Sequence, residues 1–315
     1  MIHCDLGMVL GDSGKPADAE KELRTALALY RVLVDANPAV SMFRGALAVD
    51  RGYLGVVLKW RGKATVAEAE LRTAAEIEQK LVDENPMNTG SRHDLAFVRT
   101  ILGSLLLEMG KPSEAETVLR TAVAIEQELV DDDPAYTLQH DLLAVALTYL
   151  GDVDRALGRA AEARGHYERA IALEEAQVRK DPANSVHRDY IAGSLRRRGQ
   201  TLGDLGDPAG AAADVRRALT LFDGLQPPSS WGYTETACCQ ATLAGLAGRA
   251  GSGVSAAEGV DEAARAMEWL HRAVALGYRD GNAIRIESAL DPLRDRSDFK
   301  KLMAELEMNS PLQPE

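Results

Sequence analysis

The stretch HRDYIAGS, residues 187–194, comes closest in this sequence to a catalytic motif. His-Arg-Asp opens the catalytic loop of protein kinases, where the Asp is the base and an Asn five residues later binds a metal ion. That position is Ser194 here, and Ile191 stands where a catalytic Lys would be expected. Because both groups are missing, the tripeptide alone does not predict phosphoryl transfer.

Other reactive residue types also lack the spacing that chemistry needs. The six histidines are scattered, with no HExxH pair. GSGVSAAEG, residues 251–259, lacks the third glycine of a phosphate-binding loop. Of three cysteines, Cys238 and Cys239 are adjacent, which suits neither a disulfide framework nor a zinc site; Cys238 falls in a small-residue packing column, with a reactive thiol pair as the alternative. We therefore expect no catalytic residue, no cofactor and no metal, and predict that the chain is not an enzyme.

Composition points to a helical protein. The 315 residues are 46% hydrophobic, 5% aromatic and 27% charged, and the net charge is −12. This acidity opposes binding to nucleic acid or to an anionic membrane. No apolar run reaches the ~18 residues of a membrane helix, and the N-terminus has no basic, signal-like segment. We predict a cytoplasmic protein without membrane insertion.

Small residues recur every 48 positions, and this period predicts the architecture. Two glycine columns are Gly7, Gly55, Gly103, Gly151, Gly199 and Gly14, Gly62, Gly110, Gly158, Gly206. Two alanine columns are Ala19, Ala67, Ala115, Ala163, Ala211 and Ala26, Ala74, Ala122, Ala170, Ala218. Prolines close the units at Pro38, Pro86, Pro134 and Pro182.

Apolar columns between the small residues follow helical periodicity. They are Leu29, Ile77, Ile125, Leu173, Leu221; Val34, Val82, Val130, Val178; and Leu47, Leu95, Leu143, Ile191. The second glycine marks the turn between two helices, and the first glycine and the alanines let helices approach closely. Each unit is then one helical hairpin that must stack on its neighbours to bury its apolar face. His187-Arg188-Asp189 falls at the start of such a helix, in the columns of residues 91–93 and 139–141.

The order Leu6-Gly7, Gly14, Ala19, Leu23, Ala26, Pro38 resembles the tetratricopeptide repeat (TPR), with each helix extended by about two turns. The long repeat, and ALDPLRDRSDFKKLMAEL at residues 289–306, are also similar to C-terminal tails of bacterial serine/threonine kinases. The resemblance implies an all-α, right-handed solenoid of about six stacked antiparallel hairpins with a C-terminal capping segment.

We predict a solenoid over residues 1–282, with units at about 1–38, 39–86, 87–134, 135–182, 183–228 and 229–282. Capping helices follow at 283–306, and a disordered tail at 307–315. In the sixth unit we expect a long loop over 249–263 and a second helix from about Arg265. Met1 aligns with Val49, so the first helix of unit one lacks about eight residues. We infer that the chain continues a longer protein or that its start is misplaced.

In TPR proteins the first helices line a concave groove that receives peptides, so the resemblance implies a protein or peptide partner there. In that family a carboxylate clamp needs Lys and Asn at set positions of the first helices, and long-hairpin repeats often carry an Asn just before Leu-Gly. This sequence has Tyr53, Ile101, Tyr149 and Arg197 at that Asn position. Neither signature is present, so a clamp is disfavoured. The candidate partner-binding residues are Tyr53, Lys59, Trp60, Thr100, Ser104, Tyr149, Asp152, Arg155, Arg196, Arg197 and Gln200. The arginine run at 196–198 is the best candidate site for binding an acidic segment of a partner, unless nearby carboxylates neutralise its charge.

The sequence thus predicts a noncatalytic scaffold for a partner of unknown identity. Two alternatives stay open: a regulatory or substrate-docking tail of a larger enzyme such as a serine/threonine kinase, and a module that self-associates through its incomplete first repeat.

Overall fold

The computed structural model describes residues 16–223, 230–276, 278 and 281–309. The clipped first helix expected before residue 16, the end of the fifth unit at 224–229 and the last residues of the expected tail, 310–315, lie outside this range.

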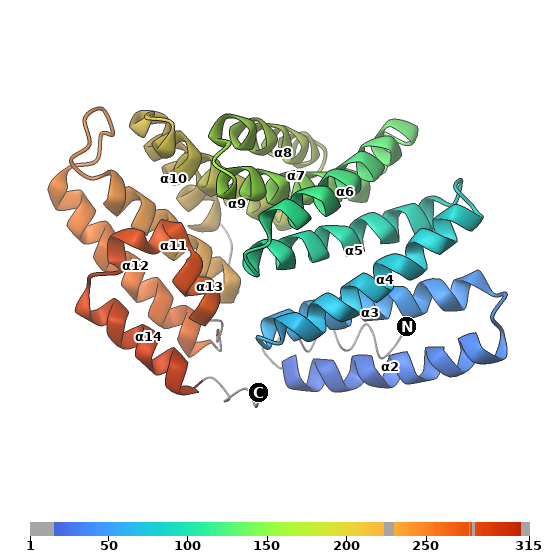
Figure 1. Ribbon diagram of the computed structural model, residues 1–315. Helices are drawn as coiled ribbons and strands as arrows, with labels where there is room; N and C mark the ends of the chain where they lie inside the picture. Colours follow the sequence, from blue (N-terminus) through green and yellow to red (C-terminus); the bar gives the residue numbers. More distant parts are fainter. Residues whose placement is uncertain (1–15, 224–229, 277, 279–280, 310–315) are drawn as a thin grey trace. The chain divides into compact units, whose positions relative to one another are not determined.

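Every regular element among the described residues is a helix (Figure 1). The elements are α2 (Pro16–Ala36), α3 (Ser41–Trp60), α4 (Ala64–Glu84), α5 (Thr89–Glu108), α6 (Pro112–Asp132), α7 (Thr137–Ala156), α8 (Ala160–Lys180), α9 (Ser185–Asp204), α10 (Pro208–Asp223), α11 (Ser230–Leu246), α12 (Ala256–Ala275), α13 (Gly281–Ile286), the 3₁₀ helix η1 (Ser288–Leu293) and α14 (Ser297–Asn309).

Long helices alternate along the chain as first and second members of antiparallel hairpins. We call α3, α5, α7, α9 and α11 the A helices, and α2, α4, α6, α8, α10 and α12 the B helices. The A helices α3, α5, α7 and α9 begin at residues 41, 89, 137 and 185, each 48 residues after the previous one. The predicted all-α architecture of stacked hairpins is therefore confirmed.

The second glycine column closes the A helices, as expected. Gly62, Gly110, Gly158 and Gly206 all have positive φ angles, between 70° and 81°. The next residue then bonds back to the helix: the Lys63 amide donates to the Leu58 carbonyl at 2.9 Å, a geometry that favours glycine at the helix end. A three-residue turn leads directly into the B helix.

The small columns allow close packing between helices of one hairpin. The alanines of both columns are buried from Ala19 to Ala218. A Cβ atom placed on Gly55 would lie 2.6 Å from Leu71 Cγ, so α3 and α4 approach too closely there for a side chain. The column of Leu47, Leu95, Leu143 and Ile191 is also buried.

One apolar column lies less deep than its pattern suggests. Ile77, Ile125 and Leu173 are only half-buried, and Leu29 is exposed. The neighbouring glutamates, Glu78, Glu126 and Glu174, hold the interior positions instead. Successive side chains of an α-helix point about 100° apart. The orientation of each B helix therefore places the glutamate column in the interior and the preceding apolar column at its edge.

The chain divides into two compact units, Met1–Val153 (unit 1) and Asp154–Glu315 (unit 2). In unit 2, α9, α10 and α11 share one apolar cluster. A second cluster joins α11 and α12 to η1 and α14 through Leu293, Phe299, Leu302 and Leu306. The C-terminal segment therefore caps the last hairpin, and α14 continues to Asn309, three residues past the predicted end of the cap.

The predicted start of the last B helix was wrong. Helix α12 begins at Ala256, not near Arg265, because the Ser255 side chain accepts a hydrogen bond from the Glu258 amide at 3.1 Å and caps it. The Ser-x-x-Glu spacing is an N-terminal signal that the glycine-rich surroundings obscured.

Candidate functional site

The A helices of unit 1 form a face on which polar and aromatic side chains of successive hairpins touch. The Tyr53 and Phe97 rings lie 5.5 Å apart, between α3 and α5. Lys59 Nζ lies 2.7 Å from a Glu108 carboxylate oxygen and 3.3 Å from Ser104 Oγ. We call this surface the unit 1 A-face.

The remaining predicted residues of unit 1 differ in exposure. Trp60, the last residue of α3, is 40% exposed, while Tyr149 and Asp152 on α7 are half-buried. Thr100 and Ser104 on α5 are buried, and both hydroxyls donate to carbonyls of their own helix. The side chains that remain accessible to a partner are thus mainly aromatic or charged.

In unit 2, Arg196 is an internal ion-pair centre. Its side chain is 1% exposed. Arg196 Nε donates to Glu235 on α11 at 2.6 Å, Nη1 donates to Gln200 at 2.9 Å, and Nη2 lies 3.5 Å from Glu287 before η1. Although burial opposes the shift, Glu235 and Glu287 raise the pKa of Arg196. Burial of Glu287 raises its pKa, but the nearby Arg196 charge outweighs burial and lowers the pKa of Glu287 to about 2.

The arginine run at 196–198 is neutralised within unit 2, which was the alternative that the sequence left open. Arg197 lies 3.6 Å from Glu235. Arg198 donates two bonds, 2.6 Å and 2.7 Å long, to Asp214 on α10. These guanidinium groups tie α9 to its neighbours, so an acidic partner would have to compete with carboxylates already in place.

The last predicted pair, Arg155 and Gln200, repeats the contact made by Lys59. Arg155 donates to Gln200 at 3.4 Å and to Asp204 at 3.2 Å. It also donates to Ser288 of η1 at 3.4 Å. A basic residue near the end of one A helix thus bonds to the next A helix in both units.

The residues of the HRD tripeptide occupy the first turn of α9, which confirms the helix-start interpretation. Asn184 caps the helix by accepting from the Val186 amide, and its Nδ2 lies 3.1 Å from His187 Nε2. His187 Nδ1 lies 3.0 Å from Glu174. Since the Asn184 amide nitrogen donates to Nε2, the imidazole carries its proton on Nδ1 and donates to Glu174. Buried His187 therefore links a cap to an interior carboxylate.

The cysteine pair is buried in unit 2. Burial raises the pKa of both thiols, which disfavours the nucleophilic thiolate. This favours the packing interpretation of Cys238.

The sequence pattern missed the interior glutamates because the apolar column one residue earlier, Ile77, Ile125 and Leu173, predicts that its own face of the helix is the buried one. Both carboxylate oxygens of Glu78 are buried without a hydrogen-bond partner. Burial, and next the Asp94 charge, raise the pKa of Glu78 to about 8. Burial also raises the pKa of Glu126, although His93, whose Nδ1 is 3.5 Å away, opposes this shift. The 48-residue recurrence of Glu was the available sequence signal.

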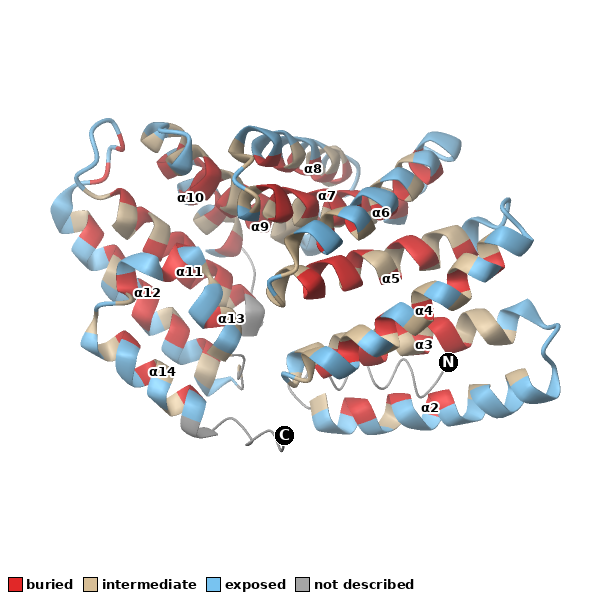
Figure 2. Ribbon diagram, in the orientation of Figure 1, coloured by how far each residue is buried: buried red, intermediate tan, exposed pale blue. Residues whose placement is uncertain are grey.

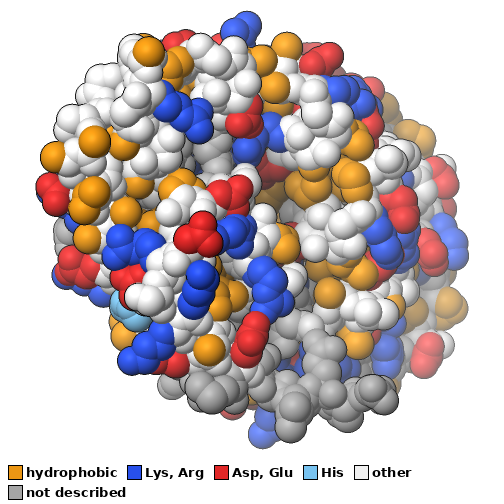
Figure 3. All heavy atoms as spheres, turned by 60° about the vertical axis from the view of Figure 1, so that its left-hand side comes forward, with side chains coloured by type: hydrophobic (Ala, Val, Ile, Leu, Met, Phe, Trp, Pro, Cys, Tyr) orange, Lys and Arg blue, Asp and Glu red, His pale blue; other side chains and the backbone are white. Residues whose placement is uncertain are grey.

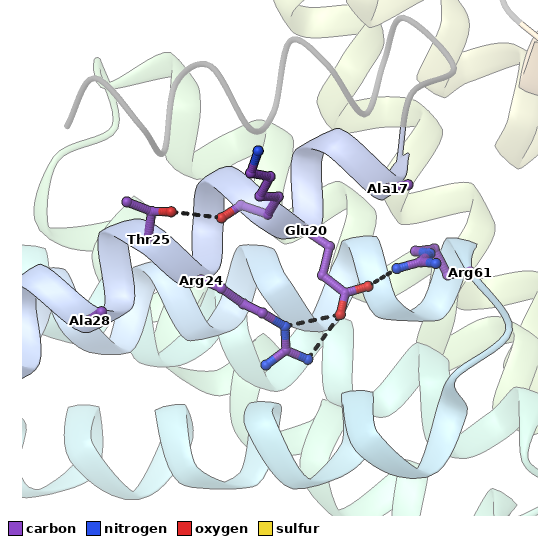
Figure 4. A pocket seen from close by; sticks show the side chains of 7 residues that line it. Ala17, Glu20, Arg24, Thr25, Ala28 and Arg61 are labelled. Carbon is purple, nitrogen blue, oxygen red and sulfur yellow. Dashed lines mark hydrogen bonds and ion pairs between the residues drawn. The ribbon is translucent and has the colours of Figure 1, made fainter.

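An open pocket of about 560 Å³ lies on α2 and the α3–α4 turn (Figure 4). Glu20 points into a set of cations, bonding to Arg24 at 3.0 Å, to Lys63 at 3.0 Å and to Arg61. Although burial opposes the shift, these cations lower the pKa of Glu20. In this arrangement the carboxylate joins α2 to the α3–α4 turn and neutralises part of the local positive charge.

Charges on the molecular surface are mixed. On the face shown in Figure 3, basic and acidic side chains drawn in colour alternate over short distances. None of the described helices is long and apolar enough to cross a membrane.

No family model and no curated protein sequence matches the chain. Among solved structures, the apo form of RapI is similar with a TM-score of 0.61 and 12% identity, covering 98% of this chain and 95% of that one. BtubC (BKLC) from P. vanneervenii has a TM-score of 0.52 and 15% identity, covering 85% and 91%. A putative kinesin light chain from Podosopora anserina, described by its TPR-like repeats, reaches 0.47 and 16%, covering 72% and 96%. At these identities the similarity concerns the fold, and the alternating A and B helices are those of a TPR-like helical repeat.

Proposed function

We propose that the protein is a noncatalytic interaction scaffold that binds a peptide or protein on the unit 1 A-face. The observation that carries this proposal is the difference between the two units. In unit 2 the predicted arginines are engaged by Glu235, Glu287 and Asp214. In unit 1 the accessible residues include the aromatic side chains of Tyr53, Trp60 and Tyr149, and tyrosine and tryptophan are enriched at binding hot spots.

Rigid presentation supports the proposal. The Tyr53 ring contacts the Phe97 ring, and Lys59 bonds to Glu108 and Ser104. Side chains that neighbouring residues already hold in place lose little conformational entropy when a partner binds. The long helices that carry these residues hold them at set intervals.

A displayed peptide library selected against the whole chain tests this proposal. We expect the selected peptides to bind at least tenfold more weakly to Trp60→Ala and to Tyr149→Ala. Arg120→Ala, at an exposed position of α6, is the matched control and should leave affinity unchanged. If selected peptides respond to Arg120→Ala and ignore both aromatic substitutions, the unit 1 A-face is not the binding surface.

The alternative role as a docking tail of a larger enzyme rests on residues 289–306. This stretch forms η1 and α14, whose apolar side chains cover α11 and α12. Its pattern is therefore accounted for by capping, which a stand-alone scaffold also needs.

A further inference from the structure

In unit 1 the ends of the B helices and the starts of the A helices lie along one edge. Arg44, in the first turn of α3, donates to Glu84 at the end of α4 at 2.7 Å. Arg92, in the first turn of α5, donates to Asp132 at the end of α6 at 3.2 Å. The short loops from α4 to α5 and from α6 to α7 are therefore neighbours, on the right of Figure 1. We call residues 83–87 and 131–138 the loop edge of unit 1.

Exposed apolar side chains lie in both loops of the loop edge. Met87 is 83% exposed, and Tyr136 and Leu138, around the start of α7, are 50% and 44% exposed. Figure 2 shows both loops as exposed. Methionine and tyrosine are enriched in protein interfaces, and exposed apolar groups with a polar rim mark interaction sites.

The same edge is acidic where helices favour basic residues. The carbonyl end of a helix carries a partial negative charge, which basic residues in the last turn offset. The last turns of α8 and α12 contain such residues, Arg179, Lys180 and Arg272. The last turns of α4 and α6 contain none, and the loop edge carries instead Asp83, Glu84, Asp131, Asp132 and Asp133. These acids oppose helix stability, so the repeat itself does not require them.

Arginines offset only part of this charge, through the two pairs at the last residues of α4 and α6. Asp83 and Asp131 accept from the neutral amides of Gln79 and Gln127, at 2.7 Å and 2.6 Å. Asp133 accepts from a backbone amide of its own loop at 3.2 Å. All three aspartates are exposed. Their hydrogen bonds leave the negative charge in place, and a cation from outside can reach it.

We propose that the loop edge of unit 1 binds a basic amphipathic segment of a partner protein. Lysine or arginine side chains of this segment pair with the three exposed aspartates, and its apolar side chains cover Met87, Tyr136 and Leu138. Charge complementarity selects this occupant, since the same carboxylates repel nucleic acid and anionic membranes. Lys59 and Trp60 end α3, whereas the loop edge lies beside its first turn. The site is therefore separate from the unit 1 A-face and stands independently of the proposed function.

The probe that tests this inference is a fluorescently labelled, end-blocked peptide of lysine and leucine, with leucine at helical spacing. Titration with the whole chain should give a saturable anisotropy change that weakens as salt rises. The double variant Asp131→Asn with Asp133→Asn, and the single variant Met87→Ser, should each weaken binding by about tenfold. Glu114→Gln is the matched control, because it removes an exposed charge from the opposite end of α6. It should leave affinity unchanged, as should Trp60→Ala, and circular dichroism verifies that the variants keep equal helix content.

Absence of saturable binding would overturn the proposal. So would binding that Glu114→Gln weakens as much as the double variant, which would mean attraction to the overall net charge. A peptide with serine in place of leucine that binds equally tightly would show that the apolar side chains contribute nothing. A loss of binding in Trp60→Ala would place the peptide on the unit 1 A-face. A dimer in light scattering that Met87→Ser converts to a monomer would assign the loop edge to a second copy of this chain.

Discussion

At the scale of single residues, the buried carboxylates distinguish this chain from a purely apolar repeat. Glu78, Glu126 and Glu174 recur at one interior position, but their surroundings differ. Glu174 accepts a hydrogen bond from His187, Glu126 lies near His93, and Glu78 has a buried carboxylate without a hydrogen-bond partner. A buried carboxylate without such a partner is held more easily as the neutral acid.

Glu78 should make unit 1 less stable as pH rises. Its pKa is raised to about 8 from 4.5, so between these values the folded chain keeps a proton that the unfolded chain has released. The stabilisation is complete below about 4.5 and is lost progressively up to about 8, by as much as about 1.4 kcal/mol per pH unit. Glu78→Gln cannot ionise, so its stability relative to the parent chain should increase over this window.

Urea unfolding at pH 5, 6.5 and 8 measures the difference between parent and variant. Glu76→Gln, at an exposed position of the same helix, is the control and should show a much smaller pH-dependent difference. A parent-to-Glu78→Gln difference that stays constant from pH 5 to pH 8 would mean that Glu78 is ionised in the folded protein.

At the scale of helices, N-caps vary between otherwise equivalent A helices. Asn88 and Asn184 cap α5 and α9 by accepting from backbone amides at 3.2 Å and 3.0 Å. Val40 holds this position before α3 and makes no side-chain cap. Valine is among the poorest N-cap residues, so α3 lacks the side-chain N-cap hydrogen bond that α5 and α9 have.

Val40→Asn should therefore stabilise unit 1 by about 1 kcal/mol, because the new side chain can accept from an amide of the first turn of α3. The converse change, Asn88→Ala, should destabilise by about the same amount. Denaturant midpoints of the two variants and the parent measure both effects. A loss of stability in Val40→Asn would show that the exposed valine contributes more by packing than a cap would.

At the scale of the whole molecule, the stacked hairpins leave surfaces that need a cover. In unit 2 that cover is the C-terminal segment, whose Ile284, Leu293, Phe299 and Leu306 are buried with residues of α11 and α12. The same segment brings Glu287 to Arg196. One segment therefore both buries an apolar surface and completes an ion-pair network.

Truncation after Ala275 should expose this surface and leave Arg196 with one carboxylate fewer. We expect a lower thermal midpoint and increased binding of a hydrophobic dye, because buried apolar area returns to water. Truncation after Asn309, which keeps α14, is the control and should leave both properties unchanged. An unchanged midpoint after the shorter truncation would show that the last hairpin is stable without its cap.

The sequence by itself determined the elements of this protein. Glycines 48 residues apart predicted the turns, because only a residue that tolerates positive φ closes these helices, and the alanine columns predicted where helices meet. Such features depend on local backbone conformation and side-chain size, which a single sequence displays directly.

Only the tertiary structure decided the roles of individual side chains. It placed Glu78 inside and Ile77 at the margin, and it engaged Arg196 with Glu235 and Glu287 from distant parts of the chain. A periodic sequence pattern does not show which of two adjacent columns faces the interior. It also does not show that Glu287, about 90 residues after Arg196, lies beside it in the fold. The physical reason is that burial and ion pairing depend on which surfaces meet in space, whereas turns and helix ends depend mainly on neighbours in the chain.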